Sequence, residues 1–381
     1  MQFRDLQKQY QILKEEIDKN MQEVLTAGNF ISGKQVGELE KQLADYVGIK
    51  HCISCANGTD AITLALMALN VGEGDAVFVP DFTFFSTGEC PAYEGAAPIF
   101  VDIDENTFNM NPQSLQSAID AVLKEGKLIP KVIIPVDLFG QPANFDEIKK
   151  IADKYNLYVI EDAAQGFGGE IRGQKACSFG DIATTSFFPA KPLGCYGDGG
   201  AIFTNDDEIA DLLKSLRVHG KGSDKYDNIR LGMNSRLDTL QAAILQVKLK
   251  AFSEYELTDV NKIAQRYTEL LTNLPTSYKI QTPFVKEGFV SSWAQYSVLL
   301  ENKEQRDGLQ AYLKEKGIPS MIYYVKPMHN QGAFKEIKTV YTDLSITEDV
   351  CNRILALPMH PYLNEEDQNY IVGNIATFLE K

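Results

Sequence analysis

The sequence is poor in histidine, cysteine and tryptophan. Of its 381 residues, four are His, six are Cys and one is Trp. The histidines are widely spaced, at His51, His219, His329 and His360. Cys52 and Cys55 form one close pair, but no second pair is present to complete a zinc site, and no disulfide framework is recognisable. We therefore expect no bound metal, reduced thiols and a cytoplasmic location.

Long hydrophobic runs are also missing, and positive charge is in deficit. No window approaches the roughly 18 consecutive apolar residues that a spanning helix needs. The chain has 37 Lys and Arg against 52 Asp and Glu, which gives a net charge of -15. Such a charge repels nucleic acid and anionic membranes. We therefore expect neither as a partner, and any anionic ligand needs a local cluster of positive groups.

Residues 50–205 alternate short β-branched runs with helical patterns. This alternation is typical of a mainly parallel sheet with helices on both faces. The predicted strands are residues 76–80, 98–102, 131–136, 158–161, 182–187 and 200–204. The helices predicted between them include residues 59–69, 111–124 and 145–155. Ligands of such sheets bind at the carboxyl ends of the strands.

The pattern changes after Asn234. Residues 235–274 read as one long helical connector with an apolar stripe. Strand and helix patterns return from about residue 281, at residues 294–300, 303–316 and 366–379. We expect a large domain over residues 1–250 and a smaller C-terminal α+β domain over residues 251–381.

Two charged residues follow predicted strands and point to cofactor chemistry. Asp162 comes directly after an apolar strand, where a carboxylate can keep a pyridinium nitrogen protonated. Lys191 lies one strand further on, among Phe, Pro and Gly, where burial disfavours the ammonium form. Either residue alone is commonly a helix cap or a loop charge. Together they predict a Schiff-base lysine and its electron-sink partner.

Two further segments support this interpretation. The turn at residues 56–61 leads straight into a predicted helix, whose first amides and dipole favour a phosphate. The segment at residues 81–86 places an aromatic residue just past a strand end, where it can stack on a flat ring. A glycine turn is often only a helix cap, and an aromatic residue is often only core.

The same blocks, in the same order, make the sequence resemble the DegT-type sugar aminotransferases, which are fold-type-I enzymes dependent on pyridoxal 5'-phosphate (PLP). The resemblance covers nearly the whole chain and is carried by residues 29–33, 56–59, 82–84, 100–104, 139–141, 161–165, 186–200 and 234–237. It implies a large domain with a mainly parallel seven-stranded sheet between helices, and a smaller C-terminal domain. It also implies a cycle between PLP and its pyridoxamine form, PMP.

The resemblance assigns roles residue by residue. It implies that Lys191 carries PLP in a Schiff base and then moves a proton, and that Asp162 pairs with the pyridine nitrogen. The other implied cofactor contacts are Gly58, Thr59 and Ser186 at the phosphate, Phe84 and Ala164 on the two ring faces, and Gln165 by the 3-hydroxyl. Asn234 is expected to reach the phosphate of a neighbouring subunit, so that a homodimer shares its two active sites.

Within the family, the sequence is most similar to the WbpE-type enzymes, which aminate C3 of a UDP-linked 3-keto-2-acetamido-hexuronate. The expected amino donor is L-glutamate. Arg236 is expected to grip a carboxylate of the sugar or of glutamate, Tyr323 to border the sugar, and His329 to contact the diphosphate or the substrate. The segment at residues 322–327 departs from the family pattern, so two alternatives stay open. These are C3 amination of a dTDP-3-keto-6-deoxyhexose and C4 amination of a UDP-4-keto sugar.

Two rival classes are less consistent with the sequence. A nicotinamide dehydrogenase would need a G-x-G-x-x-G turn after a strand, which the sequence lacks. A catalytically silent regulator with the cofactor fold would be expected to lose Lys191 or Asp162, and both are present.

Overall fold

One large sheet and two small ones organise the chain in a computed structural model that describes residues 1–224 and 226–380. The strands of the large sheet are β1 (His51–Cys55), β2 (Asp75–Pro80), β3 (Ala97–Val101), β4 (Ile129–Ile133), β5 (Tyr158–Asp162), β8 (Ile182–Ser186) and β9 (Gly200–Thr204). Their spatial order is β1-β9-β8-β5-β4-β2-β3. Only β9 is antiparallel to its neighbours. The predicted mainly parallel seven-stranded sheet is therefore confirmed.

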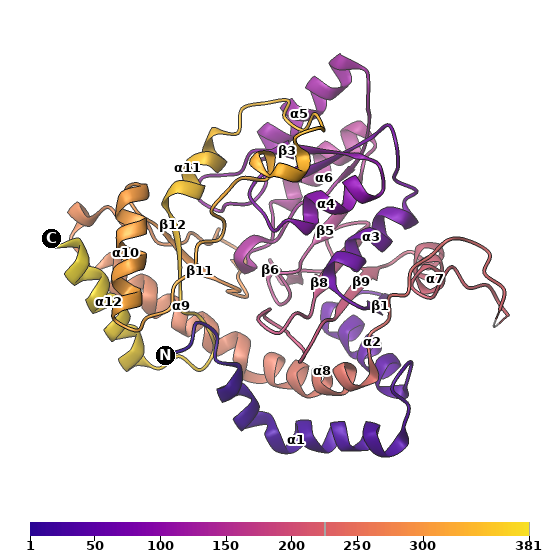
Figure 1. Cartoon of the computed structure of the whole chain (residues 1–381), viewed down its shortest axis with the longest axis horizontal. Helices are drawn as coiled ribbons and strands as arrows, with labels where there is room; N and C mark the ends of the chain where they lie inside the picture. Colours follow the sequence, from indigo (N-terminus) through magenta and orange to yellow (C-terminus); the bar gives the residue numbers. More distant parts are fainter. Residues whose placement is uncertain (225, 381) are drawn as a thin grey trace.

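Helices cover both faces of this sheet (Figure 1). One face carries α2 (Lys34–Val47), α5 (Pro112–Glu125), α6 (Phe145–Tyr155) and α8 (Thr239–Ala251), and the other carries α3 (Gly58–Ala68), α4 (Ser86–Tyr93) and α7 (Asp207–Leu216). On β2, Ala76 and Phe78 join the first core, whereas Val77 and Val79 join the second. This period of two is the reason that an unbroken apolar run forms a strand buried on both faces.

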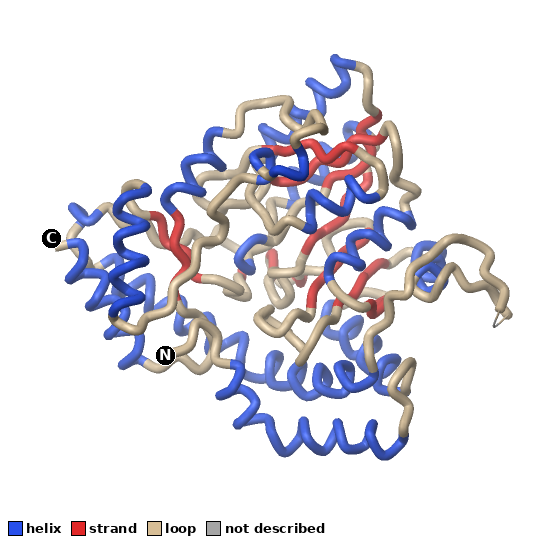
Figure 2. The backbone as a smooth tube through the Cα atoms, viewed as in Figure 1, coloured by secondary structure: helices blue, strands red, loops and turns tan. Residues whose placement is uncertain are grey.

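A second core lies in the C-terminal part of the chain. There, β11 (Tyr296–Leu299) and β12 (Ile354–Leu357) form an antiparallel pair, which appears apart from the large sheet in Figure 2. The helices α9 (Leu257–Thr272), α10 (Lys303–Glu315) and α12 (Glu365–Leu379) pack around this pair, and α11 (Ser345–Arg353) precedes β12. A third sheet joins β10 (Phe289–Val290) to β6 (Glu170–Ile171) and β7 (Gln174–Lys175).

The helical connector starts later than the sequence pattern indicated. Residues 235–238 are extended, because the amide of Ser235 donates to the carbonyl of Arg217 and Asp238 bridges to Ile31. The helix α8 begins at Thr239 and continues through a π-helical turn, Phe252–Glu256, into α9. The N-terminal helix α1 (Leu6–Ala27) lies along α8 (Figure 1), where Ile17 packs against two residues of α8.

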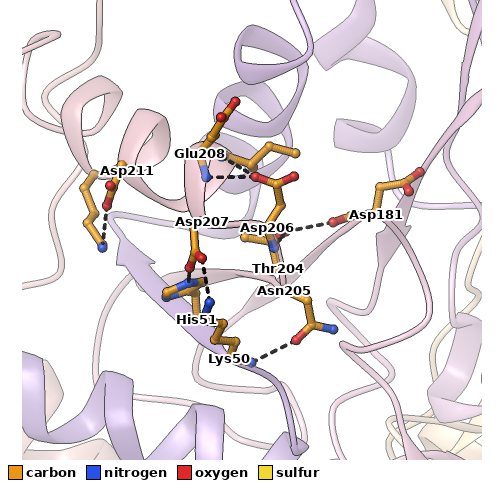
Figure 3. A network of polar contacts seen from close by, with 11 residues as sticks. Lys50, His51, Asp181, Thr204, Asn205, Asp206, Asp207, Glu208 and Asp211 are labelled. Carbon is orange, nitrogen blue, oxygen red and sulfur yellow. Dashed lines mark hydrogen bonds and ion pairs between the residues drawn. The ribbon is translucent and has the colours of Figure 1, made fainter.

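The first residue of β1 marks the end of the sheet opposite to the predicted site. His51 pairs in register with Thr204, whereas Cys55 and Ser186 both pair with Gly200 at the other end. The ring of His51 contacts Asp207 at 2.6 Å within a surface network at the start of α7 (Figure 3).

Among the described residues, no cluster of His, Cys, Asp and Glu could hold a metal ion. None of the helices within residues 1–224 and 226–380 is long and apolar enough to cross a bilayer. The six cysteines are all buried and free.

Candidate active site

The carboxylate of Asp162 lies at the carboxyl end of β5, as predicted, and both of its oxygens have donors. The hydroxyl of Thr87 donates to Oδ2 at 2.8 Å, and the amide of Ala164 donates to Oδ1 at 3.1 Å. Burial raises the pKa of Asp162, while these two hydrogen bonds and the charge of Lys191 oppose the rise. The side chain is therefore held in one orientation and responds to the charge of Lys191.

Lys191 lies in the long return between β8 and β9. Phe187 closes the base of this return, because its amide donates to Gly199 and its carbonyl accepts from Cys195, both at 2.7 Å. Burial lowers the pKa of Lys191 to about 8; Asp162 opposes this shift and Arg4 adds to it. A substantial fraction of a lysine with this pKa is neutral near pH 8, which is what a Schiff-base lysine requires.

The start of α3 forms a cradle beside the end of β8. Asn57 caps the helix by accepting from the amide of Asp60, which leaves the amides of Gly58 and Thr59 outside the intrahelical pattern. A Cβ on Gly58 would lie 2.7 Å from the Cβ of Ser186, so only glycine allows this close approach. The hydroxyl of Thr59 contacts that of Ser86 at 2.7 Å. Amides and hydroxyls thus converge on one small volume.

The residues predicted at the cofactor ring are arranged around the end of β5. Gln165 is buried, and its amide group is engaged on both sides: Oε1 accepts from the amide of Phe139 at 2.9 Å, and Nε2 donates to the hydroxyl of Tyr324 at 3.0 Å. Ala164 is half-buried. Phe84 follows β2 with 55% of its surface exposed, so its ring is free to cover a ligand. The individual roles stay predictions.

The three predicted substrate contacts lie in different surroundings. Arg236 is half-buried and donates to the side chain of Asn234, which lies at the surface. The ring of Tyr323 meets that of Phe3 edge-on, with 6.3 Å between centroids. The roles of Arg236 and Tyr323 at the substrate therefore stay predictions.

His329 is engaged with carboxylates at both ring nitrogens. Nδ1 lies 2.6 Å from buried Asp81, and Nε2 lies 3.4 Å from Glu348. The backbone amide of His329 also donates to Asp81 at 2.8 Å, and the same carboxylate raises the pKa of the imidazole. The contacts of His329 therefore anchor its loop to the end of β2, and its role at the sugar stays a prediction.

Sequence reasoning missed three residues of the site. Thr87 holds the Asp162 carboxylate, Tyr324 rather than Tyr323 bonds Gln165, and Arg4 donates to the backbone of Lys191. The nearby Thr83, whose hydroxyl contacts that of Thr87 just inside α4, gives no local signal for the first. Arg4 lies 187 residues from its partner and has no local signal.

The arrangement fits PLP. It combines helix-start amides suited to a phosphate, a buried carboxylate suited to a pyridinium, and a lysine with a depressed pKa. Lys191 and Asp162 affect each other's pKa, so the two charged groups are near enough to interact.

Known proteins are similar to this chain in both sequence and fold. The UDP-2-acetamido-2-deoxy-3-oxo-D-glucuronate aminotransferase of Pseudomonas aeruginosa is 47% identical over 96% of this chain and 96% of its own length. A DegT DnrJ EryC1 StrS aminotransferase structure from Brucella abortus superposes with a TM-score of 0.96 at 49% identity, covering all of both chains. The structure of NtdA from Bacillus subtilis with bound cofactor PMP has a TM-score of 0.88 at 32% identity, covering 97% of this chain and 82% of that one.

The sequence pattern of one family matches residues 11–376, nearly the whole chain. Together with the shared fold and the PMP-bound relative, this match confirms the predicted aminotransferase and its PLP/PMP cofactor. The chain belongs to the DegT/DnrJ/EryC1/StrS aminotransferase family.

Proposed function

We propose that this enzyme transfers the amino group of L-glutamate to C3 of a UDP-linked 3-keto-2-acetamido-hexuronate, for surface polysaccharide or glycan synthesis. The supporting observation for the reaction is Lys191 in the return after β8, whose pKa is lowered by burial, a shift opposed by the charge of Asp162 at the carboxyl end of β5. The supporting observation for the sugar is the Pseudomonas aeruginosa relative, whose name specifies a 3-oxo-glucuronate and which matches the chain almost end to end.

The proposed chemistry divides between the cofactor and the side chains. PLP, when bound, supplies an electron sink for the carbon that loses or gains a proton. Asp162, fixed by Thr87 and Ala164, keeps the ring nitrogen protonated. Lys191 would hold the cofactor through its side-chain amine, and that amine in its neutral form would move the proton. Gly58, Thr59 and Ser186 hold the phosphate.

Substrate binding calls for a positive group, because glutamate and a hexuronate both bring carboxylates to a chain of net charge -15. Arg236 is the proposed partner, since its guanidinium can grip a carboxylate with two parallel hydrogen bonds. In the structure, its Nη2 donates to Asn234, a neutral partner that a carboxylate can replace. Tyr323 and His329 are the proposed borders of the sugar site.

A homodimer with shared active sites is part of the proposal. Large apolar side chains are exposed around the site, including Phe84 and Phe188, and the segment after α7 projects from the molecule (Figure 1) and carries Leu231 with 90% of its surface exposed. Exposed apolar groups of this size mark protein interfaces. A second copy would cover them and bring Asn234 to a neighbouring phosphate. A reducing cytoplasm would suit the six free cysteines.

A substrate panel tests the proposal. Purified enzyme with PLP and L-glutamate is given the UDP-3-keto-2-acetamido-hexuronate, a dTDP-3-keto-6-deoxyhexose or a UDP-4-keto sugar, and amino-sugar formation is followed by mass spectrometry. We expect kcat/KM to be highest for the hexuronate and Arg236→Met to reduce it. Preference for either other sugar would contradict the proposed substrate and leave the aminotransferase chemistry intact.

A further inference from the structure

The N-terminal segment reaches the loop that carries Lys191. Arg4 precedes α1, and its Nη2 donates to the carbonyl of Lys191 at 2.8 Å and to the carbonyl of Pro192 at 3.3 Å. These two carbonyls belong to consecutive residues of the return between β8 and β9. One guanidinium nitrogen therefore binds the carbonyls of two consecutive residues, and it restrains the orientation of the backbone directly after the lysine.

The backbone on both sides of Arg4 is fixed. Asp5 caps α1 by accepting from the amide of Lys8 at 2.8 Å. The carbonyl of Phe3 accepts from the amide of Met359 at 3.1 Å, which ties the segment to the C-terminal part of the chain. Figure 1 shows the N-terminus on that side of the molecule, near α12. Arg4 is thus delivered to the Lys191 loop by two anchored neighbours.

The charge of Arg4 has few opposing partners. Burial lowers its pKa to about 10, with Glu256 and Tyr362 opposing the shift, so the guanidinium stays positive at neutral pH. Glu256 is itself buried and accepts from Tyr362 and from Gln9. Because the carboxylate of Glu256 is shared with these two donors, it neutralises only part of the positive charge of Arg4.

The charge of Arg4 changes the pKa values of three other basic groups. The charge of Arg4 lowers the pKa values of Lys191, Lys248 and His360, after burial in each case. The pKa of buried Lys248 falls to about 8 and that of His360 to about 4, so the imidazole is neutral at pH 7. At Lys191, Asp162 is the opposing charge and Arg4 is the like charge.

We propose that Arg4 is a positioning residue for Lys191: its two carbonyl hydrogen bonds fix the turn behind the lysine and hold the guanidinium charge beside that turn. The inference rests on the proposed role of Lys191. Its two parts are separable, because Arg4→Lys keeps the charge but loses the planar guanidinium, whereas Arg4→Gln loses the charge.

The test reads the ionisation of Lys191 directly. The full-length chain, freed of PLP, is labelled with trace acetic anhydride from pH 6 to pH 11, and mass spectrometry follows labelling of Lys191 relative to exposed Lys41 of the same molecule. We expect Arg4→Gln to raise the midpoint of Lys191 labelling by roughly half a unit to one unit, since a nearby like charge is removed. Arg4→Lys should give a smaller rise.

A matched control is Lys8→Gln, which removes an exposed positive charge four residues away and should leave the midpoint unchanged. An unchanged midpoint in Arg4→Gln, with wild-type circular dichroism, would overturn the proposal. If Arg4→Gln fails to fold, Arg4→Lys is tested instead. We expect Arg4→Lys to have a lower kcat, because the turn is disturbed, and a labelling midpoint near that of the wild type. A wild-type kcat in Arg4→Lys would overturn the positioning role. If the wild-type protein binds no PLP at Lys191, the proposed role of Lys191 fails, but the labelling midpoint still reports on Arg4.

Discussion

Lys191 and Asp162 stabilise each other's charged forms, but burial works against both charges. The pKa of the lysine falls to about 8 and that of the aspartate rises, even though each faces an opposite charge. Desolvation therefore outweighs the attraction between them. The amine of Lys191 is consequently neutral for much of the time at pH 8, while the ionised form of Asp162 depends on its hydrogen-bond donors.

Replacement of Lys191 by alanine tests the first of these groups. Lys191→Ala should abolish the visible absorbance band of lysine-bound PLP and reduce kcat by about 10³-fold or more, because proton transfer alone contributes about 10²–10⁴-fold. Absorbance with and without L-glutamate and steady-state kinetics measure both effects. Lys214→Ala, which removes an exposed lysine paired with Asp211, is the control and should behave as wild type. A persistent, glutamate-sensitive band in Lys191→Ala would contradict the assignment.

The hydroxyl of Thr87 should set the lower pH limit of activity. It donates to Asp162, which favours the ionised carboxylate. Thr87→Val removes the donor but keeps the shape, so the pKa of Asp162 rises further and the acid limb of kcat/KM moves to higher pH. A hydrogen bond to a charged group contributes about 1.5–3 kcal/mol, which corresponds to roughly one to two pH units.

The control for this shift is Thr268→Val, which removes a hydroxyl that contacts Tyr296 in the C-terminal core. This change should lower stability without moving the pH profile. An unchanged acid limb in Thr87→Val would show that the ionisation of Asp162 does not limit activity in this range.

At the scale of the element, the strands and their carboxyl ends were predictable from the sequence. The contacts between segments distant in sequence were not. The predicted strands agree with β2, β3, β4, β5, β8 and β9 to within three residues. Apolar runs with turn residues at their ends gave the local signal for β2, β3, β5 and β9, and the strand pattern also guided the choice of Asp162 and Lys191. By contrast, β1 has the sequence His-Cys-Ile-Ser-Cys, with little β-branched character, and was not predicted separately.

Contacts made in three dimensions explain the other differences. Residues 235–238 have a helical pattern, yet the amide of Ser235 donates to Arg217 and Asp238 forms a β-bridge with Ile31, so the helix starts only at Thr239. Tyr323 and Tyr324 are adjacent and alike in sequence, and only packing decides which hydroxyl meets Gln165. A single sequence carries no pattern for such choices.

The junction of α3 with β8 gives a prediction at this scale. Gly58→Ala places a Cβ 2.7 Å from the Cβ of Ser186, so α3 must shift away from the phosphate cradle. We expect a loss of about 1–3 kcal/mol in the free energy of unfolding from overpacking. The dissociation constant for PLP should rise about tenfold for each 1.4 kcal/mol lost from binding. Urea unfolding and fluorescence titration with PLP measure the two quantities.

A matched glycine is available in α2. A Cβ on Gly37 meets nothing within 4 Å, and the residue is exposed. Gly37→Ala should therefore stabilise the protein by about 1 kcal/mol through helix propensity and leave PLP binding unchanged. Equal behaviour of the two variants would contradict the cradle at Gly58.

At the scale of the whole molecule, the exposed apolar side chains need an explanation. Ile31 and Phe188 each leave about half of their surface exposed, and Leu231 leaves 90%. Phe188 directly precedes the turn that holds Lys191, and the amide of Lys191 donates to its carbonyl at 2.9 Å. A partner that covers Phe188 would therefore also enclose the proposed active site, which links assembly to catalysis.

Hybrid dimers test whether the two active sites are shared. If Asn234 serves the phosphate of the neighbouring subunit, Lys191→Ala and Asn234→Ala fail in different halves of the same site. A hybrid of the two variants then contains one site with both native residues. Random exchange of subunits should restore roughly a quarter of wild-type activity, because half of the dimers are hybrids and each has one intact site of two.

The decisive control mixes Lys191→Ala with Asp162→Asn. Asp162 ends β5 and Lys191 lies in the return that follows the neighbouring strand β8 of the same chain, so every site of that hybrid carries one of the two changes. That mixture should stay inactive after the same exchange by mild urea and dialysis, with dimer content followed by analytical ultracentrifugation. Recovery in the first mixture alone would support shared sites. If neither mixture recovers although hybrids form, Asn234 acts within its own subunit and the exposed surface around Phe188 requires another occupant.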